Sequence, residues 1–121
     1  MKPDHAQRLL DRIGMFRDPC DFDLLVFFAR HPRTLLASER LAVLLGYELG
    51  QVAASLDLLV GAGLVTRTPN QTGAAQMFVF VAGAPSHGWL HDLLQVALTR
   101  EGRLAMLGAL RRAEPGSLAT R

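Results

Sequence analysis

Two histidines, His87 and His91, stand four residues apart, a spacing that places two metal ligands on one face of a helix. A zinc site needs three or four ligands. Asp92 would point at a different angle around the helix, and the distances to Cys20 and His31 cannot be judged from the sequence. A pair of solvated imidazoles near a helix start explains the spacing as well. We therefore expect no bound metal.

The sequence contains no coherent set of catalytic residues. It lacks a glycine-rich phosphate loop and the GxSxG and HExxH motifs, and Cys20 has no base in register. Asp18, Asp21 and Asp23 are close together, but such acids before a helix are typical of helix capping. We expect neither an enzyme nor a cofactor.

Length and composition predict a globular protein of one domain, residues 1–121. Half of the residues are hydrophobic and a fifth are charged, which excludes a disordered chain. No uncharged apolar run is long enough for a membrane span, and the first residues lack the apolar segment of a secretory signal. A single cysteine, Cys20, excludes an internal disulfide framework. Together these features predict a cytoplasmic protein.

Hydrophobic periodicity predicts four helices in the first half of the chain. The first is capped by Asp4 and broken at residues 17–19, and the second, capped by Asp21, is apolar almost all round and therefore central. The third begins at Ser38 and stops at Gly46. Its predicted core residues are Leu41, Leu44 and Leu45. The fourth covers residues 48–62, and its predicted buried stripe is Val52, Leu56, Leu59 and Val60.

The period then changes to that of strands. Residues 64–68 and 77–81 are rich in β-branched and aromatic side chains, and turn-forming residues separate them, which predicts a β-hairpin. A last helical region is expected over residues 87–112, with Gly102 as a candidate break. The predicted fold class is mainly α with one small β-hairpin.

The order helix, helix, turn, helix, hairpin over residues 21–82 resembles the winged helix-turn-helix domain. Its central stretch is most similar to transcriptional regulators of the MarR and ArsR type. The matching residues are Leu41-Ala42, Leu45-Gly46-Tyr47, Val52, Leu56, Leu59, Ala62-Gly63-Leu64-Val65 and Arg67. Ala42 allows the two helices of the motif to approach closely, and Gly46 permits the sharp turn between them. Residues 1–20 and 86–113 would flank this core.

The resemblance implies a protein that binds double-stranded DNA with the start and outward face of the helix over residues 48–62. On that face Gln51 could address an adenine edge, and Ser55 a base or a phosphate. Arg67, at the base of the wing, is the best single candidate for a phosphate contact, although a salt bridge to Asp57 would explain it too. The other expected backbone contacts are Arg33, Ser38, Arg40 and Asn70.

The charge distribution is unusual for this function. No Lys, Arg or His occurs between Glu48 and Thr66, and the expected wing tip is uncharged as well. Non-specific affinity for DNA comes from neutralised phosphates, so it would have to come from arginines on neighbouring segments: Arg30, Arg33, Arg40 and Arg67. The alternative is a winged-helix module that docks another protein on the uncharged face formed by Leu49, Ala53 and Ala54.

The flanking segments predict a homodimer. In similar regulators such helices pair two protomers about a two-fold axis, and the segment from Trp89 to Leu98 is apolar enough to face both a core and a partner. The candidate dimer residues are Trp89, Leu90, Leu93, Val96, Leu98, Leu107 and Leu110.

Overall fold

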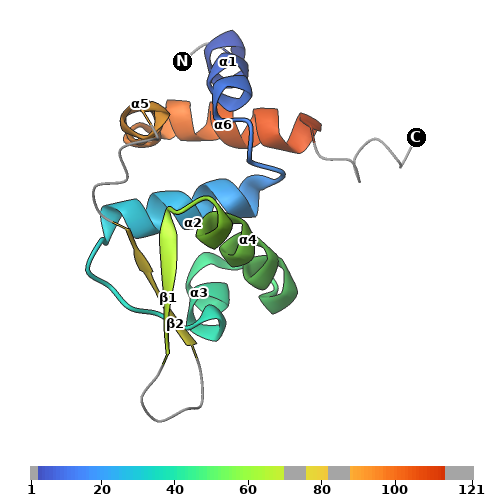
Figure 1. Cartoon of the computed structure of the whole chain (residues 1–121). Coiled ribbons are helices and arrows are strands. Elements are labelled where there is room, and N and C mark those ends of the chain that lie inside the picture. The colour runs from blue at the N-terminus through green and yellow to red at the C-terminus, as the bar shows by residue number, and fades with distance from the viewer. Residues whose placement is uncertain (1–2, 70–75, 82–87, 114–121) are drawn as a thin grey trace. The chain divides into compact units, whose positions relative to one another are not determined.

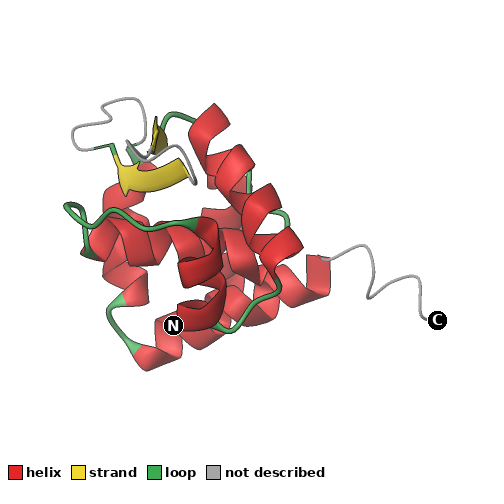
Figure 2. Cartoon of the chain, turned by 90° about the horizontal axis from the view of Figure 1, so that it is seen from below, coloured by secondary structure: helices red, strands yellow, loops and turns green. Residues whose placement is uncertain are grey.

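The computed structural model describes residues 3–69, 76–81 and 88–113, with six helices and a two-stranded antiparallel hairpin in these ranges (Figure 1). The elements in chain order are α1 (Pro3–Ile13), α2 (Pro19–Arg30), α3 (Ser38–Leu45), α4 (Leu49–Gly61), β1 (Val65–Pro69), β2 (Gln76–Phe80), α5 (Trp89–Ala97) and α6 (Arg100–Ala113). The predicted fold class, mainly α with a small hairpin, is confirmed; outside the hairpin the described elements are helices joined by turns and loops (Figure 2).

The chain divides into two compact units, and the boundary falls within α2. Residues 23–84 form the motif unit. The described residues within 1–22 and 85–121 form the flanking unit. Each unit has its own buried apolar residues, among them Leu56 in the first and Met106 in the second.

In the flanking unit, α1 packs on α5 and α6. Leu9 and Ile13 of α1 are buried, as their spacing predicts. The helix ends earlier than expected, because Gly14 adopts a left-handed φ of 71° and its N–H bonds to the Leu10 carbonyl at 2.8 Å. Phe16 thus lies beyond the helix, where its ring meets the edges of Phe22 and Trp89.

The predicted N-caps of the first three helices are wrong by one to three residues. Asp4 lies inside α1, and Ser38 is the first residue of α3 rather than its cap. At α2 the cap is Asp18, whose carboxylate accepts the N–H of Asp21 at 3.3 Å. The buried Asp21 carboxylate in turn accepts the N–H of Arg17 at 2.8 Å, in the manner of a capping box. The Asp21 carboxylate also accepts a hydrogen bond from the Arg17 guanidinium, and this bond raises the pKa of Arg17.

The last helical region is two helices, and the break lies at residues 98–99, before Gly102. Thr99 caps α6, since its hydroxyl accepts the N–H of Gly102 at 3.0 Å. Gly102 does not mark the break between α5 and α6, but a glycine is required there for steric reasons. A Cβ at this position would overlap the Val96 carbonyl oxygen, so only glycine lets the start of α6 lie against the end of α5.

In the motif unit, β1 and β2 pair from Val65 opposite Phe80 to Pro69 opposite Gln76. The bounds of both strands lie within one residue of the prediction. A β-bridge that the sequence does not predict joins Leu36 to Phe78. The Leu36 N–H donates to the Phe78 carbonyl at 3.2 Å, and the Phe78 N–H donates to the Leu36 carbonyl at 2.9 Å. Because Leu36 directly precedes α3, the bridge ties the hairpin to the first helix of the motif. The only sequence signal for it is the apolar pair Leu35-Leu36 in an otherwise polar connection.

Candidate nucleic-acid interface

The turn between α3 and α4 has helix-turn-helix geometry. The two helices bend by 113° across the break, within the roughly 90–120° of this motif. Gly46 has a φ of 77°, and the N–H groups of Gly46 and Tyr47 both bond to the Ala42 carbonyl, at 2.9 and 3.2 Å. The Tyr47 hydroxyl donates a hydrogen bond to Asp23 of α2. The turn is therefore fixed by backbone and side-chain bonds.

The two faces of α4 differ as the resemblance implies. Val52, Leu56 and Leu59 are buried, which confirms the predicted stripe, while Val60 is half-buried. The side presented to solvent begins at the helix start. Its exposed residues, counted from the N-cap, are Glu48, Leu49, Gly50, Gln51, Ala53, Ala54, Asp57 and Gly61. This surface has two carboxylates and no basic side chain.

Ser55 is not part of that surface. It is 1% exposed, so the prediction that it contacts DNA is wrong for this structure. The reason is helical geometry: Ser55 follows Val52 by three residues and precedes Leu59 by four, which places it inside the buried stripe. The resemblance implies an outward position for Ser55, and its place in this helix forbids it.

Arg67 forms the salt bridge to Asp57 that the sequence offers as the alternative to a DNA contact. Its guanidinium forms a salt bridge with Asp57 of α4 and lies over the Phe78 ring, 6.0 Å from the centroid. The Arg67 side chain is still 42% exposed. A DNA contact through Arg67 stays a prediction, and it would have to compete with Asp57.

The other predicted backbone contacts differ in their accessibility. Arg30, Arg33 and Arg40 are exposed, and their guanidinium groups make no hydrogen bond or ion pair with any residue that the structure describes. Ser38 is half-buried, and its hydroxyl lies 3.4 Å from the Glu39 carboxylate. Asn70 lies outside the described residues.

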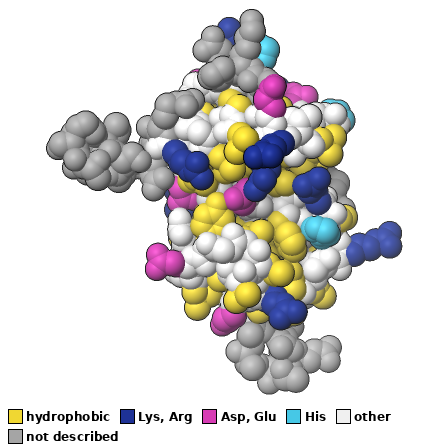
Figure 3. All heavy atoms as spheres, turned by 180° about the vertical axis from the view of Figure 1, so that it is seen from behind, with side chains coloured by type: hydrophobic (Ala, Val, Ile, Leu, Met, Phe, Trp, Pro, Cys, Tyr) yellow, Lys and Arg dark blue, Asp and Glu magenta, His cyan; other side chains and the backbone are white. Residues whose placement is uncertain are grey.

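Apolar side chains interrupt the surface between these charges. Val43 and Leu44 of α3 are 80% and 53% exposed, and Leu49 at the start of α4 is 46% exposed. The prediction that Leu44 is a core residue is therefore wrong, whereas Leu41 is fully buried as expected. Figure 3 shows that hydrophobic side chains are exposed on the surface of the chain as well as basic and acidic ones.

The candidate dimer residues fall into two groups. Leu93, Leu107 and Leu110 are buried within the chain, so their prediction as partner contacts is wrong for this structure. The spacing of these leucines along α5 and α6 turns them toward the apolar interior. Trp89, Leu90 and Val96 are half-buried, and Leu98 is 62% exposed. Leu104, which belongs to the apolar stripe predicted for the last helical region but not to the candidate dimer residues, is exposed as well.

No group of three His, Cys, Asp or Glu side chains in the described ranges is arranged to hold a metal ion. His91 is exposed, and His87 lies outside those ranges. Among the described residues no single helix is long and apolar enough to cross a membrane; α3 and α4 together would be, but they are sharply bent.

No protein-family model matches the chain, and no curated protein matches it. Two solved structures are similar. Wild-type apo MarR from Escherichia coli aligns with 21% identity over 91% of this chain and 85% of its own, with a TM-score of 0.55. The chain has a MarR-like winged-helix fold. The ST1889 protein of the thermoacidophilic archaeon Sulfolobus tokodaii aligns over 100% of both chains, with 19% identity and a TM-score of 0.54.

At these identities the likeness concerns the fold. It confirms the resemblance drawn from Gly46, Gly63 and the buried stripe of α4. Both alignments extend beyond the winged core, to 100% and 91% of this chain.

Proposed function

We propose that the chain is a cytoplasmic, DNA-binding transcriptional regulator that acts as a homodimer. The observation that carries the proposal is the combination, within one unit, of helix-turn-helix geometry, an accessible α4 start, and three arginines without partners among the described residues. A helix that offers no basic side chain can still lie in the major groove if neighbouring segments hold the phosphates.

Arg30, Arg33 and Arg40 supply the electrostatic affinity in this proposal. Each neutralised phosphate adds about 0.9 to the slope of log K against log salt concentration. Three arginines per protomer, duplicated by two-fold pairing, would give a slope of about −5 for the dimer. Arg67 would add to it only when it leaves Asp57. Binding should therefore be weak at physiological salt and strong at low salt.

Gln51 is the proposed base-reading residue. Its side chain is exposed in the first turn of α4, and the amide can bond in bidentate fashion to an adenine. Ser38 and Asn70 remain proposed phosphate contacts. Removing Gln51 as Gln51→Ala should relax the preferred sequence while leaving the affinity for random DNA nearly unchanged, because an uncharged side chain contributes nothing to counterion release.

The test of DNA binding uses fluorescence anisotropy of a labelled random duplex at low and at physiological salt. Saturable binding that falls steeply with salt supports the proposal. Selection from a random duplex pool, with the wild type and Gln51→Ala in parallel, then tests whether α4 reads bases. No binding at low salt would remove DNA as the partner.

The proposed dimer rests on the flanking unit, where Leu98 and Leu104 offer exposed apolar side chains. Size-exclusion chromatography with light scattering measures the mass directly. A dimer mass at micromolar concentration is expected. A monomer mass at that concentration would contradict the proposal that two protomers related by a two-fold axis bind DNA together.

One observation favours a second function, a winged-helix module that binds another protein. Val43, Leu44 and Leu49 expose large apolar side chains on or beside the helix-turn-helix, where a DNA-binding surface would carry basic ones. The anisotropy experiment separates the two functions, since a docking module would show no salt-dependent affinity for random duplex.

A further inference from the structure

Three large apolar side chains are exposed around the turn where α3 and α4 meet (Figure 1). Val43 and Leu44 of α3 and Leu49 of α4 are 80%, 53% and 46% exposed, and we call these three residues the turn patch. They are three of the six large hydrophobic residues that the described part of the chain exposes. Clustered exposed apolar side chains with polar groups at their edge are typical of protein interaction sites.

Helix geometry turns the patch away from the core of the motif unit. Val43 follows the buried Leu41 by two positions, which is about 200° around a helix, so the two side chains point in nearly opposite directions. Leu44 and Leu49 lie on the two sides of the turn. Because backbone and side-chain hydrogen bonds fix this turn, a partner would not have to order it on binding.

The charges beside the turn patch are mainly negative. Glu39 lies one helical turn before Val43, and Glu48 directly precedes Leu49. Both carboxylates are exposed, and neither forms an ion pair with a residue that the structure describes. Arg40 is the one basic residue within α3 and α4. Since the whole chain has a net charge of +2, the surface around the turn differs in sign from the protein average.

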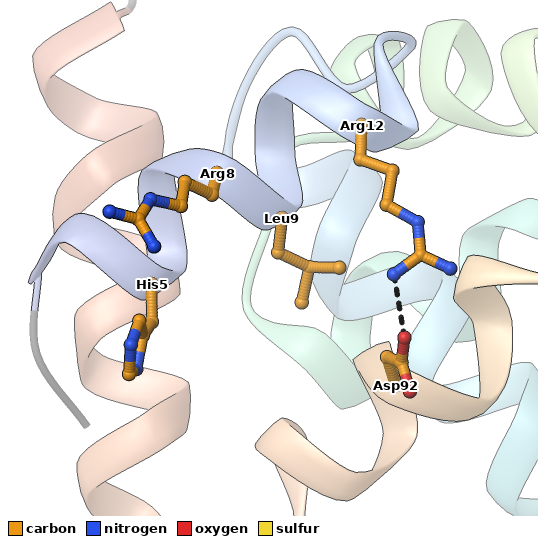
Figure 4. Close-up of a pocket in the computed structure, with 5 residues that line it drawn as sticks. All are labelled: His5, Arg8, Leu9, Arg12 and Asp92. Carbon is orange, nitrogen blue, oxygen red and sulfur yellow. Dashed lines mark hydrogen bonds and ion pairs between the residues drawn. The ribbon is translucent and has the colours of Figure 1, made fainter.

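A groove of about 320 Å³ on the flanking unit carries the opposite charge. It lies between α1 and α5 and is lined by His5, Arg8, Leu9, Arg12 and Asp92 (Figure 4). Arg12 donates a hydrogen bond to the Asp92 carboxylate at 2.6 Å, so that pair is close to neutral. The Arg8 guanidinium has no hydrogen-bond or ion-pair partner in the described ranges, and it leaves the groove positive. A basic partner would therefore be repelled by this groove.

We propose that the turn patch binds an amphipathic helix of another protein, with leucine-like side chains on one face and Lys or Arg at the edges of that face. The apolar face covers the turn patch, and the basic side chains pair with Glu39 and Glu48. Apolar contact supplies the affinity, and the two carboxylates select a basic helix over an acidic one. The proposal gives a partner chemistry to the second function proposed above, and it rests on that function.

The test is fluorescence anisotropy of two labelled synthetic peptides, each titrated with the full chain in the absence of DNA. The basic probe has Leu at helical positions three and four apart and Lys at its other positions. In the acidic probe every Lys is replaced by Glu. Saturable binding of the basic probe is expected, at least about tenfold tighter than that of the acidic probe. The net charge of the protein alone would produce the reverse preference.

Two variants separate the apolar part of the interaction from the charged part. Leu44→Ser removes apolar surface and should weaken binding of the basic probe about tenfold. The double variant Glu39→Gln with Glu48→Gln removes both carboxylates and should remove the preference for the basic probe. Its loss of affinity should be only several-fold, because exposed ion pairs are individually weak.

Each variant has a matched control on the flanking unit. Leu98→Ser removes a leucine that is 62% exposed, more than Leu44 is. Asp11→Asn with Asp92→Asn changes the net charge by the same amount as the double glutamine variant. Neither control should change the affinity for the basic probe by more than about twofold. All substituted positions are exposed, and circular dichroism checks that each variant is folded.

The proposal is overturned by any of three results: no saturable binding of the basic probe, acidic-probe binding that is as tight, or equal losses in Leu44→Ser and Leu98→Ser. Losses confined to the variants around the turn support it. Because DNA is absent from these titrations, failure of this proposal is distinguishable from failure of DNA binding, which the salt titration of random duplex measures separately.

Discussion

The outward faces of α4 and α1 carry charge in opposite ways. On α4, the helix proposed to enter DNA, the exposed side carries Leu49, Gln51, Ala53 and Ala54, with carboxylates at Asp57 and at Glu48 just before the helix, and no basic side chain. On α1, in the flanking unit, one face has His5, Arg8 and Arg12 around a groove. The fold alone would suggest the reverse, with basic groups on the DNA-reading helix. The comparison shows that architecture and electrostatics are specified separately in this chain.

Both units nevertheless use the same device to select which arginine is available. Asp57 pairs with Arg67 in the motif unit, and Asp92 pairs with Arg12 in the flanking unit. In each unit other guanidinium groups have no partner in the described ranges: Arg8 in one, and Arg30, Arg33 and Arg40 in the other. Exposed ion pairs contribute only about 0–1 kcal/mol to stability, so these aspartates matter more for the surface charge than for the fold.

The largest expected effect separates the two faces of α4. Leu56→Ala removes a side chain that is 1% exposed and should lower the free energy of unfolding by about 2–5 kcal/mol, through lost burial and a cavity. Leu49→Ala, on the exposed face of the same helix, should cost about 0.5 kcal/mol or less. Urea denaturation measures both. Equal losses would mean that the two faces are assigned incorrectly.

A second pair of substitutions compares glycines in the two units. Gly102→Ala should destabilise the chain by about 1–3 kcal/mol, because the added methyl group overlaps the Val96 carbonyl and forces α6 away from α5. At Gly50 a Cβ meets nothing within 4 Å, so Gly50→Ala should stabilise α4 by about 0.5–1 kcal/mol. Thermal unfolding gives both values. A Gly102→Ala protein as stable as the wild type would contradict the close approach of α5 and α6.

A stability effect smaller than those of Leu56→Ala and Gly102→Ala, together with a visible effect on binding, is expected for Asp57→Asn. Its exposed salt bridge should change the free energy of unfolding by no more than about 1 kcal/mol. Releasing Arg67 should tighten binding of random duplex DNA several-fold and make the salt slope of the dimer steeper by up to about 1.8. Anisotropy titrations measure both quantities.

The matched control for that prediction is Asp11→Asn, which removes the same charge from an exposed position on α1. If it tightens DNA binding as much as Asp57→Asn, the gain comes from net charge and Arg67 has no specific role.

Periodicity was enough to predict the motif. The buried stripe of α4 and the turn at Gly46 follow from apolar spacing and from the one residue that adopts a positive φ there at no cost. The same spacing rule places Ser55 inside, whereas the resemblance implies an outward position for it. Leu44 was misassigned for the converse reason, since an apolar side chain is buried only where a neighbouring element covers it.

The site could be predicted only in part, because charge pairing depends on contacts between distant residues. Arg67 and Asp57 are ten residues apart on adjoining elements, so the salt bridge could be named as an alternative. Arg12 and Asp92 are separated by 80 positions, and no local pattern brings them together. The groove on α1 was therefore invisible in the sequence, although the spacing of His5, Arg8 and Arg12 on one helical face was available.

The most direct test of the proposed function is the salt dependence of duplex DNA binding, compared between the wild type and a variant with Arg30→Gln, Arg33→Gln and Arg40→Gln. The account predicts a wild-type slope of about −5 that falls close to zero in the variant, because these three arginines supply nearly all of the positive charge that neutralises phosphates. An unchanged slope, or a wild type that does not bind at low salt, would contradict it.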